Sequence, residues 1–447
     1  MQHGEARPHD HGLPAALYVI SGASFAAALS ARALDPVLPH VAEDFGVSIA
    51  TAAGFAAVFA FTFSIIQPIV GAAADLFGKT RLMIGCLALL GLANILGALS
   101  TSFSVLFATR ILAGIGSGGV FPVALSLTSD LVGPEKRQVA ISRTLAGAMT
   151  GNLLGASASG LIGDFLGWRG VLAVLGVLVI VASIAVAAGF RGAKVKHPPK
   201  TSLSALKAGY RTIFTNPNAY VCYSAVFVEG CCVLGLFPYI ASFLFELGQT
   251  SLSIAGIVIA GFAVGGLFYT LTVSRLLPWL GMKGMMIAGM TLVASQLVAV
   301  AFGPRWEVQA LNLIVMGWGF YIAHGCLQVF ASELSVEARA TALSLHSFFF
   351  FMGQTVGPLA YGFGLQHGGK MPTLFVSAAI MVVLGIICAR LLKPRAPADA
   401  REILFGPKGG SPHHDTVGSV YMAHELLLFW ANRGVRPWTP SPSVCPA

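Results

Sequence analysis

Long apolar runs, separated by short polar breaks, recur along the sequence from Leu13 to Leu392. Each run is close to the length of about 20 residues that a helix needs to cross a hydrocarbon core of ~30 Å. The runs are continuously apolar and lack strand-like alternation, which favours helices over barrel strands. We therefore expect twelve membrane-spanning helices, over 14–34, 48–73, 82–99, 104–128, 139–162, 170–190, 219–243, 252–276, 283–303, 307–331, 341–365 and 372–392.

The composition agrees with a membrane protein. Of the 447 residues, 56% are hydrophobic and only 10% are charged, whereas an ordinary soluble domain is about 25% charged. The apolar content is also too high for a disordered chain. The class that remains is an all-α integral membrane protein.

The net charge of +9 could indicate a nucleic-acid partner, but the placement of the basic residues argues against one. With the N-terminus inside, 22 of the 27 lysines and arginines fall on the cytoplasmic side, and the exceptions are Arg32, Arg110, Arg169, Arg305 and Lys370. Such a bias orients membrane proteins. We expect both termini in the cytoplasm, no cleaved signal peptide, and no nucleic-acid partner.

A polar stretch around 191–217 separates six predicted spans from the other six. The expected organisation is a cytoplasmic N-terminus (1–13), an N-terminal six-helix bundle (14–190), a cytoplasmic linker (191–218), a C-terminal six-helix bundle (219–392) and a cytoplasmic tail (393–447). The tail holds proline, glycine, histidine and scattered charges, which predicts disorder.

The two halves resemble each other when the sequence is shifted by 202 positions. Residues 135–167 then align with 337–369, including Gly151 with Gly353 and Gly155 with Gly357. Both copies also begin with Glu-x-Arg, which favours duplication over shared composition. Two six-helix halves related by an axis along the membrane normal are typical of transporters whose substrate site lies between them, near the midplane.

Between the second and third spans the sequence reads Gly71-Ala-Ala-Ala-Asp75-Leu-Phe-Gly78-Lys79-Thr-Arg81. This segment resembles the major facilitator superfamily signature G-x3-D-x2-G-[RK]-x-[RK]. In such a latch we expect Gly71 to allow close helix packing and Asp75 to face a helix N-terminus of the other bundle. Gly78 would permit a tight turn, while Lys79 and Arg81 would stay in water near lipid headgroups.

Two further segments carry the resemblance, which covers roughly 14–392. Arg110-Ile-Leu-Ala-Gly114-Ile-Gly116 resembles the superfamily motif R-x3-G-x-G, which is associated with proton coupling. The run around Gly151 resembles the glycine-rich antiporter motif, but Asn152 stands where that motif has proline. The resemblance is greatest to the bacterial twelve-helix drug:proton antiporter and sugar-efflux branch.

Few polar side chains occur within the spans, and five of them are candidates for a substrate cavity. They are Gln67, Asn152, His324, Gln328 and Gln354. His324 and Gln328 are four residues apart and share a helix face. These groups could equally join helices by hydrogen bonds.

Glu229, Arg110 and Asp35 are the candidates for proton coupling. Glu229 would lie ~15 Å deep, close to the midplane, where desolvation favours a protonated carboxyl. It could instead be a protonated acid that only bonds a neighbouring helix. Arg110 would lie ~9 Å deep and tune coupling, unless its role is purely structural or it snorkels to the outer interface. Asp35 could approach it from the same face, with Arg32 as a competitor.

These features predict a secondary transporter in the bacterial inner membrane that moves a small molecule by alternating access. We expect proton-coupled efflux of a drug or sugar-like metabolite, with an uptake symporter on the same fold as the alternative. No nucleotide-binding motif, nucleophile constellation or zinc spacing of cysteines is present in the sequence, so we expect no enzyme activity and no metal or cofactor beyond the coupling proton. The expected partners are the substrate and membrane lipids, and the expected state is a monomer.

Overall fold

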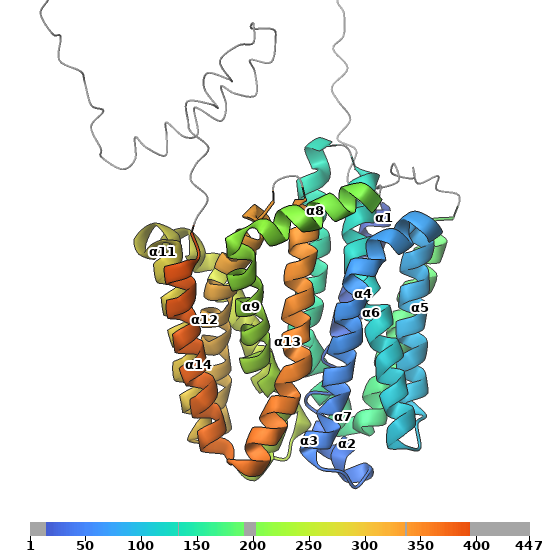
Figure 1. Cartoon of the computed structure of the whole chain (residues 1–447). Helices are drawn as coiled ribbons and strands as arrows, with labels where there is room; N and C mark the ends of the chain where they lie inside the picture. Colours follow the sequence, from blue (N-terminus) through green and yellow to red (C-terminus); the bar gives the residue numbers. More distant parts are fainter. Residues whose placement is uncertain (1–14, 133, 192–202, 336–337, 394–447) are drawn as a thin grey trace, which may run out of the picture. The chain divides into compact units, whose positions relative to one another are not determined.

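The computed structural model describes residues 15–132, 134–191, 203–335 and 338–393. The predicted N-terminal segment, residues 192–202 of the predicted linker and nearly all of the predicted tail lie outside these ranges. The regular secondary structure of the described part is helical (Figure 1). Its elements are α1 (Ala15–Ser30), α2 (Leu38–Asp44), α3 (Ile49–Ala52), α4 (Gly54–Phe77), α5 (Lys79–Ala98), α6 (Phe103–Leu131), α7 (Pro134–Gly189), α8 (Leu203–Thr215), α9 (Pro217–Cys232), the 3-10 helix η1 (Leu234–Leu236), α10 (Phe237–Glu246), α11 (Leu252–Ala301), α12 (Trp306–Glu333), α13 (Arg339–His367) and α14 (Lys370–Leu391).

Every predicted span is helical along most of its length. Within the described ranges, eight helical stretches are long and apolar enough to cross a membrane. Two of them are double spans, because α7 bends at Gly167 (φ 67°) and α11 bends at Gly281 (φ 63°). The shorter apolar helix α1 and the helix α13 complete the set of twelve.

The first predicted span ends early, and the seventh is interrupted. The sequence placed the first span over 14–34, whereas α1 ends at Ser30 and a turn leads to α2, which begins at Leu38. In the seventh, α9 ends at Cys232 and is followed by η1 and α10. Pro36 and Pro238 lie in or next to these breaks, and proline lacks the N–H that would continue the hydrogen-bond ladder.

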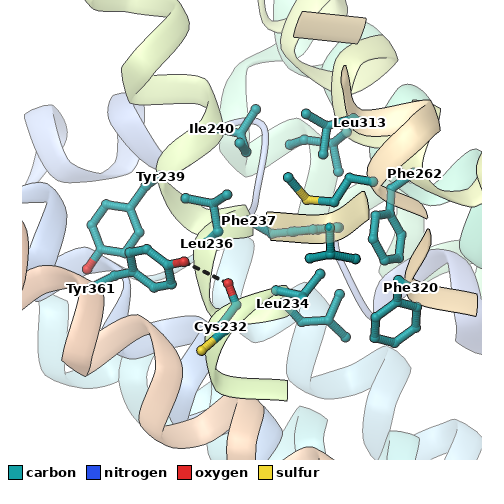
Figure 2. Close-up of a cluster of buried hydrophobic side chains, with 14 of the residues drawn as sticks. Cys232, Leu234, Leu236, Phe237, Tyr239, Ile240, Phe262, Leu313, Phe320 and Tyr361 are labelled. Carbon is teal, nitrogen blue, oxygen red and sulfur yellow. Dashed lines mark hydrogen bonds between the residues drawn. The ribbon is translucent and has the colours of Figure 1, made fainter. Parts of the chain in front are cut away.

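Two tyrosines connect the seventh span to α13 at the break, and Figure 2 shows the bond from Tyr361. The Tyr361 hydroxyl of α13 donates to the Cys232 carbonyl at 2.6 Å, and the Tyr239 hydroxyl of α10 donates to the Pro358 carbonyl at 2.6 Å. A helix end leaves its last carbonyls without partners. The bond from Tyr361 therefore satisfies a carbonyl at the end of α9, and both bonds fasten α13 to the broken span.

The structure contains the internal repeat at the same offset of 202 residues. A side chain at Gly155 would place its Cβ 2.8 Å from the Leu29 carbonyl of α1, and one at Gly357 would place it 2.6 Å from the Cys231 carbonyl of α9. The two glycines are 202 positions apart, and so are their partners Leu29 and Cys231. Close approach of backbones at glycine is a common way to pack membrane helices, and here both halves use it at equivalent places.

The halves meet along α7 with α11 and along α4 with α13. We call the two ends of the helical bundle the α8 end and the α2 end (Figure 1). At the α2 end, Gly160 packs on the backbone of Leu252, and Gly362 packs on Ala50. These two contacts are also equivalent, because the two glycines are 202 positions apart and so are their partners. The Asp164 carboxylate accepts hydrogen bonds of 2.8 Å from the backbone N–H groups of Leu252 and Ser253. Such capping satisfies the free donors of a helix start.

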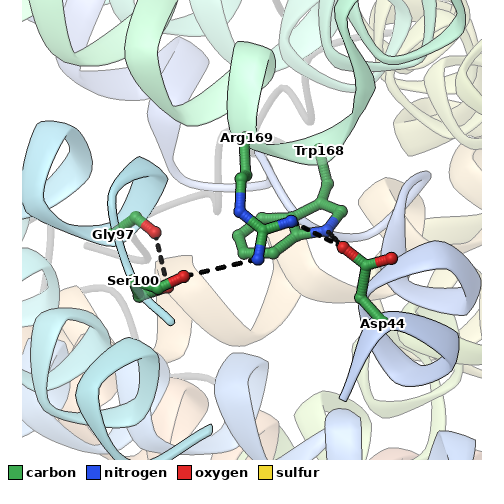
Figure 3. A network of polar contacts seen from close by, with 5 residues as sticks. All are labelled: Asp44, Gly97, Ser100, Trp168 and Arg169. Carbon is green, nitrogen blue, oxygen red and sulfur yellow. Dashed lines mark hydrogen bonds and ion pairs between the residues drawn. The ribbon is translucent and has the colours of Figure 1, made fainter. Parts of the chain in front are cut away.

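A polar network at the α2 end joins α2 to α5 and α7 (Figure 3). The Asp44 carboxylate accepts hydrogen bonds from the Trp168 indole at 2.8 Å and from Arg169 at 2.6 Å, and Arg169 also donates to the Ser100 carbonyl at 3.4 Å. The bonds from Trp168 and Arg169 hold the pKa of Asp44 below its usual value.

Within the predicted linker the structure has a helix that the sequence analysis did not foresee. Helix α8 packs against α9 and α13, and Ile213 on its inner face is fully buried. The apolar positions Leu203, Leu206, Tyr210 and Ile213 follow a spacing of three or four residues. That stripe is the signal of an amphipathic helix and was available in the sequence.

Candidate functional site

A cavity of about 600 Å³ lies between the two halves. Its wall extends from Asp35, near the α2 end, to Leu145 of α7 and Ser347 of α13, in the halves of those helices nearer the α8 end. Much of the wall is aromatic. Phe262 packs edge-on against Phe237 at 5.0 Å between ring centroids and lies 5.1 Å from Phe320 (Figure 2).

Glu229 and His324, two residues that the sequence analysis singled out separately, form a pair in the cavity wall. His324 Nδ1 and Glu229 Oε2 are 2.7 Å apart and share a hydrogen bond. His324 lines the cavity, whereas Glu229 lies behind it and is fully buried. The pair can hold one proton on either partner, so a proton can move between the cavity surface and the buried carboxyl.

The His324 ring is held among other rings. It stacks on Phe320 at 5.0 Å, lies 4.8 Å from Phe350 and meets His346 edge-on at 5.0 Å between centroids. His346 also lines the cavity and is 3% exposed. This packing fixes the imidazole with Nδ1 toward Glu229.

Arg110 lines the cavity from α6 and is 3% exposed. Its Nη2 donates to Asn94 Oδ1 at 2.6 Å, and the Asn94 amide in turn donates to the Ser30 hydroxyl at 3.3 Å. Among the residues that the structure describes, no carboxylate lies within ion-pair distance of Arg110, and its Nε has no hydrogen-bond partner. The guanidinium is therefore oriented by a neutral amide and not by an acid.

Asp35 forms its ion pair with Arg32 and not with Arg110. Arg32 Nη1 lies 3.0 Å from Asp35 Oδ2, and the Arg32 guanidinium stands 4.5 Å over the Phe237 ring. The second nitrogen donates to Gln354 Oε1 of the other half at 3.5 Å. Arg32 lines the cavity, a position that the sequence analysis did not assign to it. The separation of three residues between Arg32 and Asp35 was the signal in the sequence that these two side chains could pair.

All five predicted cavity residues line the cavity: Gln67, Asn152, His324, Gln328 and Gln354. Gln67 also joins two helices, because its amide donates to the Gly118 carbonyl of α6 at 3.1 Å. Gln67 therefore both lines the cavity and joins two helices by a hydrogen bond.

The segment 71–81 agrees with the sequence in part. Gly78 has φ 82°, the left-handed region that a tight turn needs, and Arg81 is exposed. The expectation that Lys79 stays free in water is wrong, because its ammonium lies 2.6 Å from Asp130 at the end of α6 and its side chain is 9% exposed. The Lys79 ammonium pairs with the Asp130 carboxylate on the adjacent helix end instead of being hydrated. The packing of Gly71 and the side chain of Asp75 lie outside the described structure.

Two helical halves with equivalent contacts, around a central cavity walled by both, define a secondary transporter of small molecules. The chain belongs to the Major Facilitator Superfamily, whose sequence profile matches residues 20–335 and 249–441. The predicted fold class, an all-α integral membrane protein of two pseudo-symmetric bundles, is thereby confirmed, as is the expectation that the chain is not an enzyme.

Two curated relatives cover most of this chain. The chloramphenicol resistance protein of Streptomyces lividans is 24% identical over 87% of this chain and 100% of its own length. The 3-(3-hydroxy-phenyl)propionate transporter of Escherichia coli (strain K12) is 28% identical over 73% of this chain and 81% of its own. Among solved structures, a D-xylose-proton symporter superposes with a TM-score of 0.70 at 13% identity, covering 84% of this chain and 97% of the symporter. At this sequence identity the similarity shows a shared fold.

Proposed function

We propose that this protein exports a small organic molecule across the bacterial cytoplasmic membrane in exchange for protons. The observation that carries the proposal is the buried Glu229 carboxyl, hydrogen-bonded at 2.7 Å to His324 in the cavity wall. A carboxyl in such a place is the kind of group that proton-driven transporters use. The resistance proteins among the relatives support efflux as the direction.

The α8 end is the cytoplasmic end in this proposal. Lys79, Arg81, Lys207 and Arg211 belong to it, and basic residues accumulate on the cytoplasmic side. The contacts of Asp164, Gly160 and Gly362 between the halves then lie at the outer end. With this orientation, the proposed state is one that is closed at the outer end, with the cavity on the cytoplasmic side of those contacts.

The moving parts are the two predicted bundles, 14–190 and 219–392, joined by the linker and acting within one monomer. When they rock, the contacts at the outer end open and the segment 71–81 closes the cytoplasmic end. Asp75 is proposed to dock on the other bundle in that second state. Both termini remain in the cytoplasm.

Glu229 is the proposed proton carrier, and His324 connects it to the cavity. Arg110 is proposed to tune coupling through its positive charge in the same cavity. Asp35 is the second candidate carrier. Its carboxylate already has a basic partner, Arg32, at 3.0 Å, whereas Glu229 is bonded to His324.

Uptake by proton symport is the second candidate function. Asn152 replaces the proline of the antiporter motif, and one relative is named a transporter of an aromatic acid without reference to resistance. The two directions predict opposite proton movements, so they can be separated by experiment.

The test uses membrane vesicles with the full chain, and chloramphenicol and 3-(3-hydroxyphenyl)propionate as probes. In energised inverted vesicles, export in exchange for protons should release protons from the acidic lumen when a probe is added, which a pH-sensitive dye reports. In de-energised right-side-out vesicles, symport should instead make the medium alkaline. Proton movement of neither kind, with any compound of a wider panel, would refute proton coupling.

A further inference from the structure

We propose that the molecule carried by this cavity is an organic anion with an aromatic body, and that Arg110 binds its carboxylate. The inference rests on the proposed function in one respect only, namely that the cavity is the transport site. It does not depend on proton coupling or on the direction of transport.

The charges that line the cavity do not balance. Arg32, Asp35 and Arg110 line it. Arg32 and Asp35 neutralise each other across 3.0 Å. The other nearby carboxyl, Glu229, lies behind His324, with which it shares its hydrogen bond. The positive charge of Arg110 is thus left without an acid among the described side chains.

An unbalanced guanidinium at this depth is costly. Arg110 is 3% exposed and lies within the span α6, where charged groups are rare and usually mark a substrate path. A buried charge is normally paired or hydrogen-bonded throughout. Because Arg110 faces the cavity, the missing partner can be supplied by whatever occupies the cavity.

The local geometry favours a carboxylate over a single-atom anion. Asn94 holds one terminal nitrogen at 2.6 Å and is itself held by Ser30, so the plane of the guanidinium is fixed. Nε is buried and has no hydrogen-bond partner in the described structure, so a ligand is expected at the terminal nitrogens, on the side of Arg110 that lines the cavity. Arginine presents its donors in a planar fork that matches the two oxygens of a carboxylate.

The rest of the cavity supplies a place for an aromatic body. Phe55, Phe59 and Phe63 line it from α4, in the same half as Arg110. Gly114, one turn after Arg110, packs on the α4 backbone at Phe59, so the charged and aromatic walls adjoin. Phe63 and Phe351 of the other half lie 4.1 Å apart between ring centroids. An aromatic ring of a ligand can pack against such walls in the offset or edge-on arrangements that rings prefer.

The experiment compares two probes of equal shape on the purified full chain in lipid nanodiscs. 3-Phenylpropionate carries the carboxylate, and 3-phenylpropanamide replaces it with a neutral amide. Calorimetric titration of the wild-type protein should show that the carboxylate binds at least about tenfold more tightly, the ratio expected for one charge-assisted hydrogen bond. Equal affinities, or no binding of the carboxylate, would overturn the inference without any variant.

Substitutions then locate the preference. Arg110→Gln should bind both probes equally, Arg110→Lys should keep part of the preference for the carboxylate, and the control Arg305→Gln, in an exposed pair with Glu307, should behave as wild type. A preference that persists in Arg110→Gln overturns the assignment. If the preference depends on Arg110 but no proton moves in vesicles, the inference stands and the proposed coupling fails. Proton-coupled export with no preference for the anion overturns the inference and leaves the proposed function standing.

Discussion

Replacing Glu229 by glutamine should uncouple this transporter without unfolding it. The two side chains have nearly the same volume, and the amide can still bond His324, which now lies 2.7 Å from the carboxyl. Glu229 Oε1 has no hydrogen-bond partner among the described residues. The substitution therefore breaks no second bond, and its cost should not exceed the about 1–3 kcal/mol of one buried unsatisfied group.

The expected effect on transport can be stated as a concentration ratio. One pH unit is worth about 1.4 kcal/mol per proton, or a factor of ten in an equilibrium constant. With the membrane potential clamped at zero and a pH difference of two units, exchange of one proton per substrate supports a gradient of about a hundredfold. If Glu229 is the sole carrier, the variant should support no gradient, a ratio of one.

The assay is transport into proteoliposomes, with the compound that moves protons in vesicles. Counterflow of labelled against unlabelled substrate needs no net proton movement, so it should persist in Glu229→Gln while uphill accumulation is lost. Glu307→Gln, at an exposed glutamate paired with Arg305, is the matched control and should keep both activities. A Glu229→Gln protein that still concentrates substrate in a pH-dependent way would refute the assignment, and Asp35 would become the next candidate.

Three further outcomes are expected. Asp75→Asn should insert and fold but lose most transport if the carboxylate docks on the other bundle in the outward-open state; wild-type rates in a well-inserted variant would exclude this role. Truncation after Arg395 should leave transport unchanged, because the remainder contains no predicted span, whereas loss of insertion or activity would show that the tail docks on the bundle. Because hydrogen bonds lower the folded-state pKa of Asp44, its stabilising effect is complete above the unfolded pKa of about 3.9 and disappears as pH falls through the folded value. Asp44→Asn should therefore lower the unfolding temperature at pH 7 but not below the folded-state pKa, as followed by tryptophan fluorescence, and an equal decrease at both pH values would contradict this reasoning.

The positions of the spans were predictable from the sequence because hydrocarbon leaves little choice of composition. The sequence also predicted the repeat, since close packing at Gly151 and Gly353 requires glycine in both halves. The break after Cys232, inside the seventh predicted span, was not foreseen, and the first helix ends at Ser30, before the predicted end of its span at residue 34. Proline marks such places only as candidates, and the breaks depend on tertiary partners such as Tyr361, which bonds the Cys232 carbonyl. Lys79 was misjudged for the same reason, because Asp130 is 51 residues away in the sequence.

The ionisable residues of the cavity are not repeated between the two halves. The sequence could therefore identify them as candidates but could not predict which of them contact one another. At the offset of 202, Glu229 corresponds to Ala27, and Arg110 corresponds to Asn312. The duplicated frame therefore places one ionisable acid in the C-terminal half and one unpaired base in the N-terminal half, at positions that are not equivalent. Glu229 meets His324 across 95 residues, a separation at which no periodicity indicates contact. Arg110 lines the cavity from one half, and Glu229 is connected to it through His324 of the other half. Rocking of the halves would therefore change the surroundings of both groups together, which is the physical basis of the proposed coupling between proton binding and substrate binding.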